Sequence, residues 1–148
     1  MKKNKAIFYF IFYYLPVFLW MGLIFYFSSL QGNGIKWEPN FWFYAERKGA
    51  HIFEYFVLTF LIARAFFAGE KIESTRPDLK DKNFLKIILA GAVSLLYAFS
   101  DEMHQAFVFG REGKISDIGI DLAGILIAIF IVIRFRKNKF FKTIFYVK

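Results

Sequence analysis

The sequence predicts an all-α, polytopic membrane protein with four transmembrane helices and both termini in the cytoplasm. Three observations predict this fold: an apolar composition, four long apolar segments, and an uneven distribution of lysine and arginine. Hydrophobic residues make up 57% of the 148 residues, whereas soluble domains contain roughly 45–50%. The 22 Phe, 8 Tyr and 3 Trp suit hydrocarbon and its interface with water. Cysteine is absent, which excludes disulfides and thiolate metal sites.

The four apolar segments cover about residues 6–30, 49–68, 84–105 and 115–133, and each is long enough to cross a hydrocarbon core of about 30 Å. The first is longer than the roughly 7–15 residues of a signal-peptide core, so we expect a retained helix that kinks at Pro16. Residues 31–46 and 69–83 are expected to be loops. The basic tail, 134–148, is expected to lie on the anionic leaflet. Residues 1–148 then form one membrane domain.

The positive charges are concentrated in alternate connections of the chain. Of the 20 Lys and Arg residues, fifteen lie in the N-terminal segment, in the loop 69–83 with its flanking Arg64 and Lys86, and in the tail. The remaining five lie in the other two loops. Because cytoplasmic loops are enriched in Lys and Arg, both termini and the middle loop are expected inside a multi-pass cell-membrane protein. This orientation accounts for most of the net charge of +8, so we expect the lipid bilayer as a partner and no nucleic acid.

The third apolar segment ends in the polar sequence Ser-Asp-Glu-Met-His-Gln at residues 100–105. On a helix that turns about 100° per residue, Asp101, His104 and Gln105 share one face and Glu102 lies on its flank. A short loop with glycines on either side of Arg111 follows. Its length would bring this guanidinium back over the acids, as an ion pair or an anion clamp.

Two further helices carry matching polar faces at their ends. Arg47, His51 and Glu54 lie within about 60° of one another at the start of the second helix. Asp117 and Asp121 are one turn apart at the start of the fourth helix, and intramembrane acids are expected to face other helices. Their face continues through two small residues, Gly124 and Ala128, of the kind found where membrane helices pack closely.

The predicted topology places all three polar ends on the extracytoplasmic side, so we expect them to meet, with Arg47 or Arg111 paired to an acid. Such a cluster could be a hydrogen-bonded network that fixes helix register. It could also be a hydrolytic or transfer site, because adjacent acids and a histidine can divide the acid and base roles. A hard divalent cation held by carboxylates and one imidazole is a further alternative, and the sequence contains no specific metal or nucleophile motif. The candidate catalytic residues are His51, Glu54, Asp101 and Glu102, and the candidate ligand-binding residues are Arg47, Lys48, Tyr55, His104, Gln105, Arg111, Asp117 and Asp121.

The same residues, taken in order, resemble the VanZ-like family of small bacterial membrane proteins. The resemblance rests on Arg47-Lys48-xx-His51-xx-Glu54-Tyr55, on Ser100-Asp101-Glu102-xx-Gln105 with Arg111, on Asp117-xxx-Asp121-xx-Gly124, and on Ser28-Ser29 at the end of the first helix. Leu30 stands where a glutamine often follows the serines, and Asp121 stands where asparagine is frequent. The resemblance implies a role in the cell envelope, which in the founding case is lower susceptibility to the lipoglycopeptide teicoplanin.

The residues and the resemblance together predict an extracytoplasmic acidic pocket that binds or acts on an envelope lipid, a glycan or a lipoglycopeptide antibiotic. A membrane-embedded hydrolase or transferase, metal-assisted or not, is the second hypothesis. A structural or partner-binding membrane subunit is the third.

Overall fold

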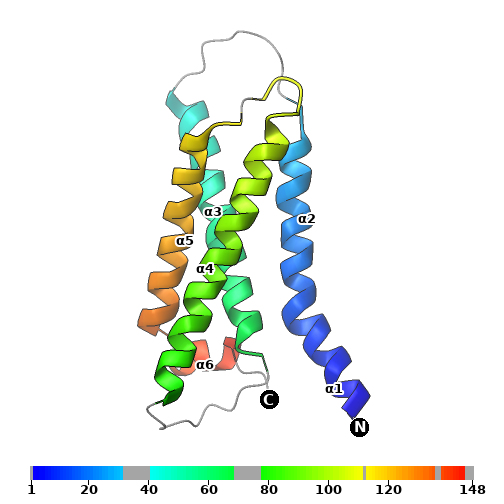
Figure 1. The fold of residues 1–148 in the computed structure, drawn as a ribbon, viewed down its shortest axis with the longest axis vertical. Coiled ribbons are helices and arrows are strands. Elements are labelled where there is room, and N and C mark those ends of the chain that lie inside the picture. Colours follow the sequence, from blue (N-terminus) through cyan, green and yellow to red (C-terminus); the bar gives the residue numbers. More distant parts are fainter. Residues whose placement is uncertain (1, 32–40, 69–77, 112, 136–137, 146–148) are drawn as a thin grey trace.

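The computed structural model describes residues 2–31, 41–68, 78–111, 113–135 and 138–145, and all regular secondary structure within these ranges is helical. Four helices are long and apolar enough to cross a membrane, over Lys5–Ser29, Ala45–Phe66, Lys82–Gln105 and Ile115–Phe135. They run in alternating directions along one bundle (Figure 1). The elements in order are α1 (Lys2–Tyr9), η1 (Phe10–Tyr14), α2 (Leu15–Ser29), α3 (Phe41–Phe66), α4 (Asp78–Gln105), α5 (Ile115–Phe135) and α6 (Lys139–Phe145).

The first transmembrane helix is built from α1, η1 and α2, with the π-helical η1 next to Pro16. Proline has no N–H to donate to the carbonyl four residues earlier, which belongs to Phe12. The Nη1 of Arg64 donates to that carbonyl oxygen at 2.6 Å. The chain bends between α1 and α2 (Figure 1), and a helix from elsewhere in the bundle thus supplies a donor that the proline removes.

Two helices begin earlier than the sequence predicted. Helix α3 begins at Phe41 rather than Gly49, within the expected first loop, and α4 begins at Asp78 rather than Phe84, within the expected second loop. The reason is that hydropathy marks the part of a helix inside the membrane, while the helix itself continues into polar or interfacial residues. The turn signals at residues 32–40 lie outside the described residues.

The most extensive helix contact in the bundle joins α3 to α5. Helix α5 buries the predicted face of small residues there, including Gly124 and Ala128. A Cβ on Gly124 would collide with the carbonyl oxygen of Ile52 and would lie 3.0 Å from its carbonyl carbon. The expected close approach is confirmed, and it places Asp121, one turn earlier on α5, beside His51 of α3.

Helix α6 packs across the end of the bundle where α1 also lies (Figure 1). Phe145 is buried and its ring centroid lies 5.3 Å from that of Phe60 on α3. The Nε of Arg64 donates to the carbonyl oxygen of Ile144 at 2.8 Å. The hydroxyl of Tyr13 donates to the carbonyl oxygen of Phe145 at 3.2 Å. The described part of the tail therefore docks onto the bundle, and Arg64 binds backbone carbonyls rather than only extending toward water.

Candidate functional site

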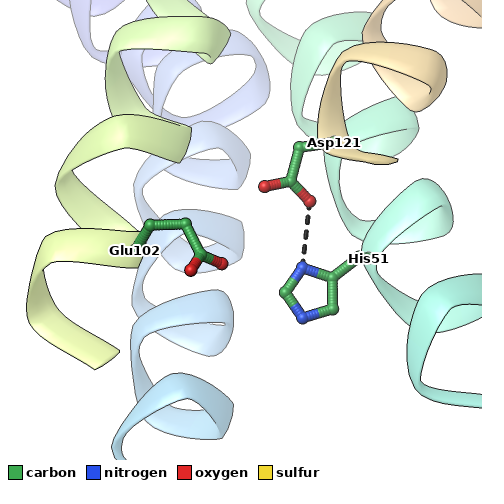
Figure 2. Close-up of side chains that lie close together, drawn as sticks. All are labelled: His51, Glu102 and Asp121. Carbon is green, nitrogen blue, oxygen red and sulfur yellow. Dashed lines mark hydrogen bonds and ion pairs between the residues drawn. The ribbon is translucent and has the colours of Figure 1, made fainter. Parts of the chain in front are cut away.

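Three acidic and imidazole side chains meet at the bundle end opposite α6, one from each of α3, α4 and α5. His51 Nδ1 lies 2.9 Å from Asp121 Oδ1, and the Glu102 carboxylate faces this pair (Figure 2). One ligating atom of each residue lies within 4.8 Å of one ligating atom of the other two. The exposed fractions are 7% for His51, 5% for Glu102 and 0% for Asp121. We call this group the His51 cluster.

Each acid of the His51 cluster has one oxygen with a hydrogen bond and one without. Glu102 Oε2 accepts from the backbone N–H of Lys114 at 2.9 Å, and Asp121 Oδ1 faces His51. The second oxygens, Glu102 Oε1 and Asp121 Oδ2, are buried and have no hydrogen-bond partner among the described residues. A buried acceptor without a partner costs about 1–3 kcal/mol, and more when it is charged. The cluster therefore has binding capacity that the protein itself does not use.

A glycine determines how the loop before α5 closes over Glu102. A Cβ on Gly113 would collide with the backbone oxygen of Glu102 and lie 3.1 Å from the side chain of Ala106. Only a residue without a side chain allows the loop to pack this tightly on the last turn of α4. The next residue, Lys114, then directs its backbone N–H at the Glu102 carboxylate.

A second group surrounds Asp101, and its hydrogen bonds are satisfied. The hydroxyl of Ser28 donates to Asp101 Oδ1. The Nε2 of Gln105 donates to Asp101 Oδ2 at 2.9 Å and also lies 3.1 Å from the Ser28 oxygen. Asp101 and Gln105 were predicted to share a face, and this is confirmed. Because both carboxylate oxygens have partners, Asp101 ties α4 to α2 and offers less to a ligand than Glu102 does.

Arg111 does reach back over the end of the bundle, but not to an acid. Its Nε donates to the carbonyl of Leu30 at 2.8 Å and its Nη2 to that of Phe27 at 2.6 Å, where a cation suits the C-terminal end of α2. Its Nη1 lies 3.4 Å from Gln105 Oε1. Burial lowers the pKa of Arg111 and the charge of Arg47 lowers it further. The expected ion pair of either arginine with an acid is wrong within the described residues, where His51 pairs with Asp121.

His104 belongs to neither group. Its ring stacks on Phe25 with a centroid distance of 4.5 Å, and its Nε2 lies 3.0 Å from the hydroxyl of Ser29. The ring of His104 therefore contacts α2, whereas His51 of α3 pairs with Asp121 of α5.

The remaining candidates lie at different depths around the His51 cluster. Tyr55 is fully buried, and its hydroxyl has no hydrogen-bond partner in the described part of the chain. Glu54, Arg47 and Asp117 are half-buried. Lys48 is exposed, although it lies only about 60° from His51 around α3. The structure therefore brings most of the predicted face together but not Lys48.

The family model described as VanZ/LLP1 matches residues 8–136, which is most of the chain. The chain belongs to the VanZ/LLP1 family. The resemblance that the ordered motifs indicated is thus confirmed. The matched residues of this VanZ/LLP1 protein include the whole His51 cluster and the group around Asp101. The searches of curated proteins and of solved structures found no match.

Sequence reasoning placed the acids of this VanZ/LLP1 protein but missed two of their partners. Ser28, which binds Asp101, was noted as part of the family pattern and not as a site residue. The feature of the sequence that could have indicated its role is a hydroxyl at the end of an otherwise uncharged helix. The backbone N–H of Lys114, which binds Glu102, has no signal of its own in the sequence except the glycine before it. The pairing of His51 with Asp121 across two helices was likewise not specified by spacing.

Proposed function

We propose that this VanZ/LLP1 protein binds the polar part of a lipid-anchored envelope molecule, such as a lipoglycopeptide or a lipid-linked glycan, in the His51 cluster. The observation that carries the proposal is the pair of buried carboxylate oxygens, on Glu102 and Asp121, that have no hydrogen-bond partner in the described part of the chain. A register-fixing network would be expected to satisfy its own acceptors. Intramembrane acids with spare capacity are typical of ligand or ion sites.

The position of the cluster supports an extracytoplasmic ligand. It lies at the end of the bundle away from α1 and α6 (Figure 1). The described elements at the other end, α1, the end of α3, the start of α4 and α6 (Figure 1), belong to or flank the parts of the sequence that carry fifteen of the 20 lysines and arginines. By the positive-inside rule that end is cytoplasmic, and the cluster lies toward the extracytoplasmic side.

The surroundings of the cluster favour a ligand that stays in the membrane. Large apolar side chains near the cluster are exposed on α3, on the end of α4 and on the segment that follows it. Phe53 is 58% exposed, Met103 67% and Phe107 87%. Such a surface suits acyl chains, so a ligand anchored by lipid would reach the polar cluster sideways from the bilayer. Teicoplanin, a lipoglycopeptide, has this combination of acyl chain and polar body.

A second function, hydrolysis or group transfer, is favoured by the orientation of the histidine. Asp121 contacts the Nδ1 of His51. The other ring nitrogen, Nε2, therefore points away from Asp121 (Figure 2). An imidazole oriented by a carboxylate is the usual arrangement of a general base. Glu102 would then supply a second acid within the same cluster.

The test is antibiotic susceptibility combined with direct binding. The wild type and the Glu102→Gln variant are expressed at equal folded yield in a teicoplanin-sensitive bacterium, and a photoreactive teicoplanin derivative is used to label the purified proteins. We expect the wild type to lower susceptibility and to be labelled, and Glu102→Gln to lose both. Glu46→Gln, an exposed acid on α3, is the matched control and should behave as the wild type. A Glu102→Gln variant that equals the wild type in both assays would contradict the proposal and favour a structural subunit.

A further inference from the structure

We propose that His51, Glu102 and Asp121 bind one divalent transition-metal ion, such as Mn²⁺ or Zn²⁺. The proposal rests on the proposed function of the same cluster, because the cluster would bind the metal ion first and the envelope molecule through it. It is carried by two independent observations. The three side chains place one ligating atom each within 4.8 Å of one another, and two of their carboxylate oxygens are buried with no hydrogen-bond partner among the residues that the structure describes.

The donor set matches the charge and the chemistry of such an ion. Two carboxylates and one neutral imidazole carry a net charge of −2, which a divalent cation neutralises. Without a cation, two acids at exposures of 5% and 0% would repel each other in a medium of low dielectric constant. Carboxylates alone would favour Mg²⁺ or Ca²⁺, but an imidazole nitrogen shifts the preference to Mn²⁺, Fe²⁺ or Zn²⁺.

The distances agree with coordination after a small adjustment. Bonds of about 2.1 Å to nitrogen and oxygen place two ligand atoms about 3 Å apart when they subtend 90° at the ion. His51 Nδ1 and Asp121 Oδ1 are 2.9 Å apart. Ligand atoms at a tetrahedral angle are about 3.4 Å apart, so an outer limit of 4.8 Å requires ligand atoms to approach one another by at most about 1.5 Å. Rotation about the side-chain bonds of a glutamate supplies a movement of that size.

Neighbouring groups hold the three donors in place, as is usual around metal ligands. The N–H of Lys114 binds one oxygen of Glu102 and leaves the other free. The contact of Gly124 with Ile52 fixes the distance between α5 and α3, and hence between Asp121 and His51. Asp101 is not part of the group whose ligating atoms lie within 4.8 Å of one another, and its two oxygens bind Ser28 and Gln105.

Three protein ligands leave at least one coordination position open. Structural zinc sites are closed by four protein ligands, whereas sites that bind or activate a ligand keep a position for it. The open position of this ion would accept an oxygen atom of an anionic or carbonyl group on the envelope molecule. This would explain how a cluster of acids can bind an anionic headgroup such as a phosphate.

The experiment is metal binding by the full-length protein, purified without a histidine tag, in lipid nanodiscs after treatment with EDTA. Isothermal titration with MnCl₂ and with ZnCl₂ should show one ion per wild-type chain for at least one metal, and the same metal should raise Tm. Glu102→Gln should weaken binding by at least about tenfold, as loss of a ligand or its support does. Glu46→Gln should leave the affinity within about twofold of the wild type.

The outcomes separate the metal site from the proposed function. No binding by the wild type, or equal affinity in Glu102→Gln, would overturn the metal proposal even if teicoplanin labelling depends on Glu102. Metal binding that Glu102→Gln abolishes, with labelling unchanged, would support the metal site and contradict the proposed function. If Glu102→Gln does not fold, X-ray absorption of the zinc-loaded wild type decides. We expect one imidazole in the first coordination shell, and a shell without imidazole would overturn the proposal.

Discussion

Replacing Gly124 by alanine tests the helix contact on which the His51 cluster depends. The added Cβ would collide with the carbonyl oxygen of Ile52 and would lie 3.0 Å and 3.1 Å from its carbonyl carbon and Cα. Ordinary contacts between carbon atoms are about 3.5–4.0 Å. Helices α3 and α5 must therefore separate by roughly 0.5–1 Å, and the 2.9 Å contact between His51 and Asp121 would lengthen by a similar amount.

The effect of Gly124→Ala on the free energy of unfolding is the sum of three contributions. Overpacking costs about 1–3 kcal/mol, and weakening a hydrogen bond to a charged group costs about 1.5–3 kcal/mol more. The better helix propensity of alanine returns about 0.5–1 kcal/mol. The net destabilisation is then about 1.5–5.5 kcal/mol, and at roughly 2–4 °C per kcal/mol for a chain of this size Tm should fall by about 3–22 °C.

Thermal unfolding in one detergent measures this change, and Gly119→Ala on the same helix is the matched control. A Cβ on Gly119 would meet nothing within 4 Å, so this variant should gain about 0.5–1 kcal/mol from helix propensity alone. If Gly124→Ala is as stable as Gly119→Ala, then α3 and α5 do not pack as described. Asp121 would then not be positioned by the contact between Gly124 and Ile52.

Two further predictions concern orientation and the opposite end of the bundle. A cysteine at Phe109, which is 74% exposed, should react with a membrane-impermeant maleimide in intact cells. A cysteine at Thr75 should react only after lysis. The reverse pattern would place the His51 cluster on the cytoplasmic side. Replacing Arg64 by methionine removes the hydrogen bonds to Phe12 and Ile144 and should cost about 1.5–3 kcal/mol, with faster proteolysis after α6 undocks. Unchanged stability and proteolysis would contradict the role of Arg64 in docking α6.

The fold and the set of polar residues could be predicted because both follow from one-dimensional patterns. Apolar segments and the distribution of basic residues indicate the number and order of transmembrane helices. Helical periodicity placed Asp101 with Gln105, and the stripe through Gly124 indicated the face of α5 that packs. These inferences need only spacing along one helix.

The partners of the polar residues could not be predicted, because they depend on the relative rotation and depth of different helices. Arginine was expected to pair with an acid, but Arg111 meets the C-terminal carbonyls of α2, which supply negative dipoles that charge counting does not include. The sequence places both His51 and His104 at polar helix ends, and only packing assigns one to Asp121 and the other to Phe25. The ends of α3 and α4 extend beyond the predicted bounds because helices continue past the membrane.

The most direct test of the His51 cluster as a working site is the Tm of Glu102→Gln in the presence of EDTA, compared with the wild type at equal folded yield. Glutamine keeps an oxygen that accepts from the N–H of Lys114. It removes the negative charge of a carboxylate whose second oxygen, Oε1, is buried with no hydrogen-bond partner among the described residues. We therefore expect Tm to be unchanged or higher while teicoplanin labelling and metal binding are lost, as is common where binding sites trade stability for function. A fall in Tm of several degrees that accompanies the loss of both would contradict this conclusion, because it would mean that Glu102 serves to hold the helices together.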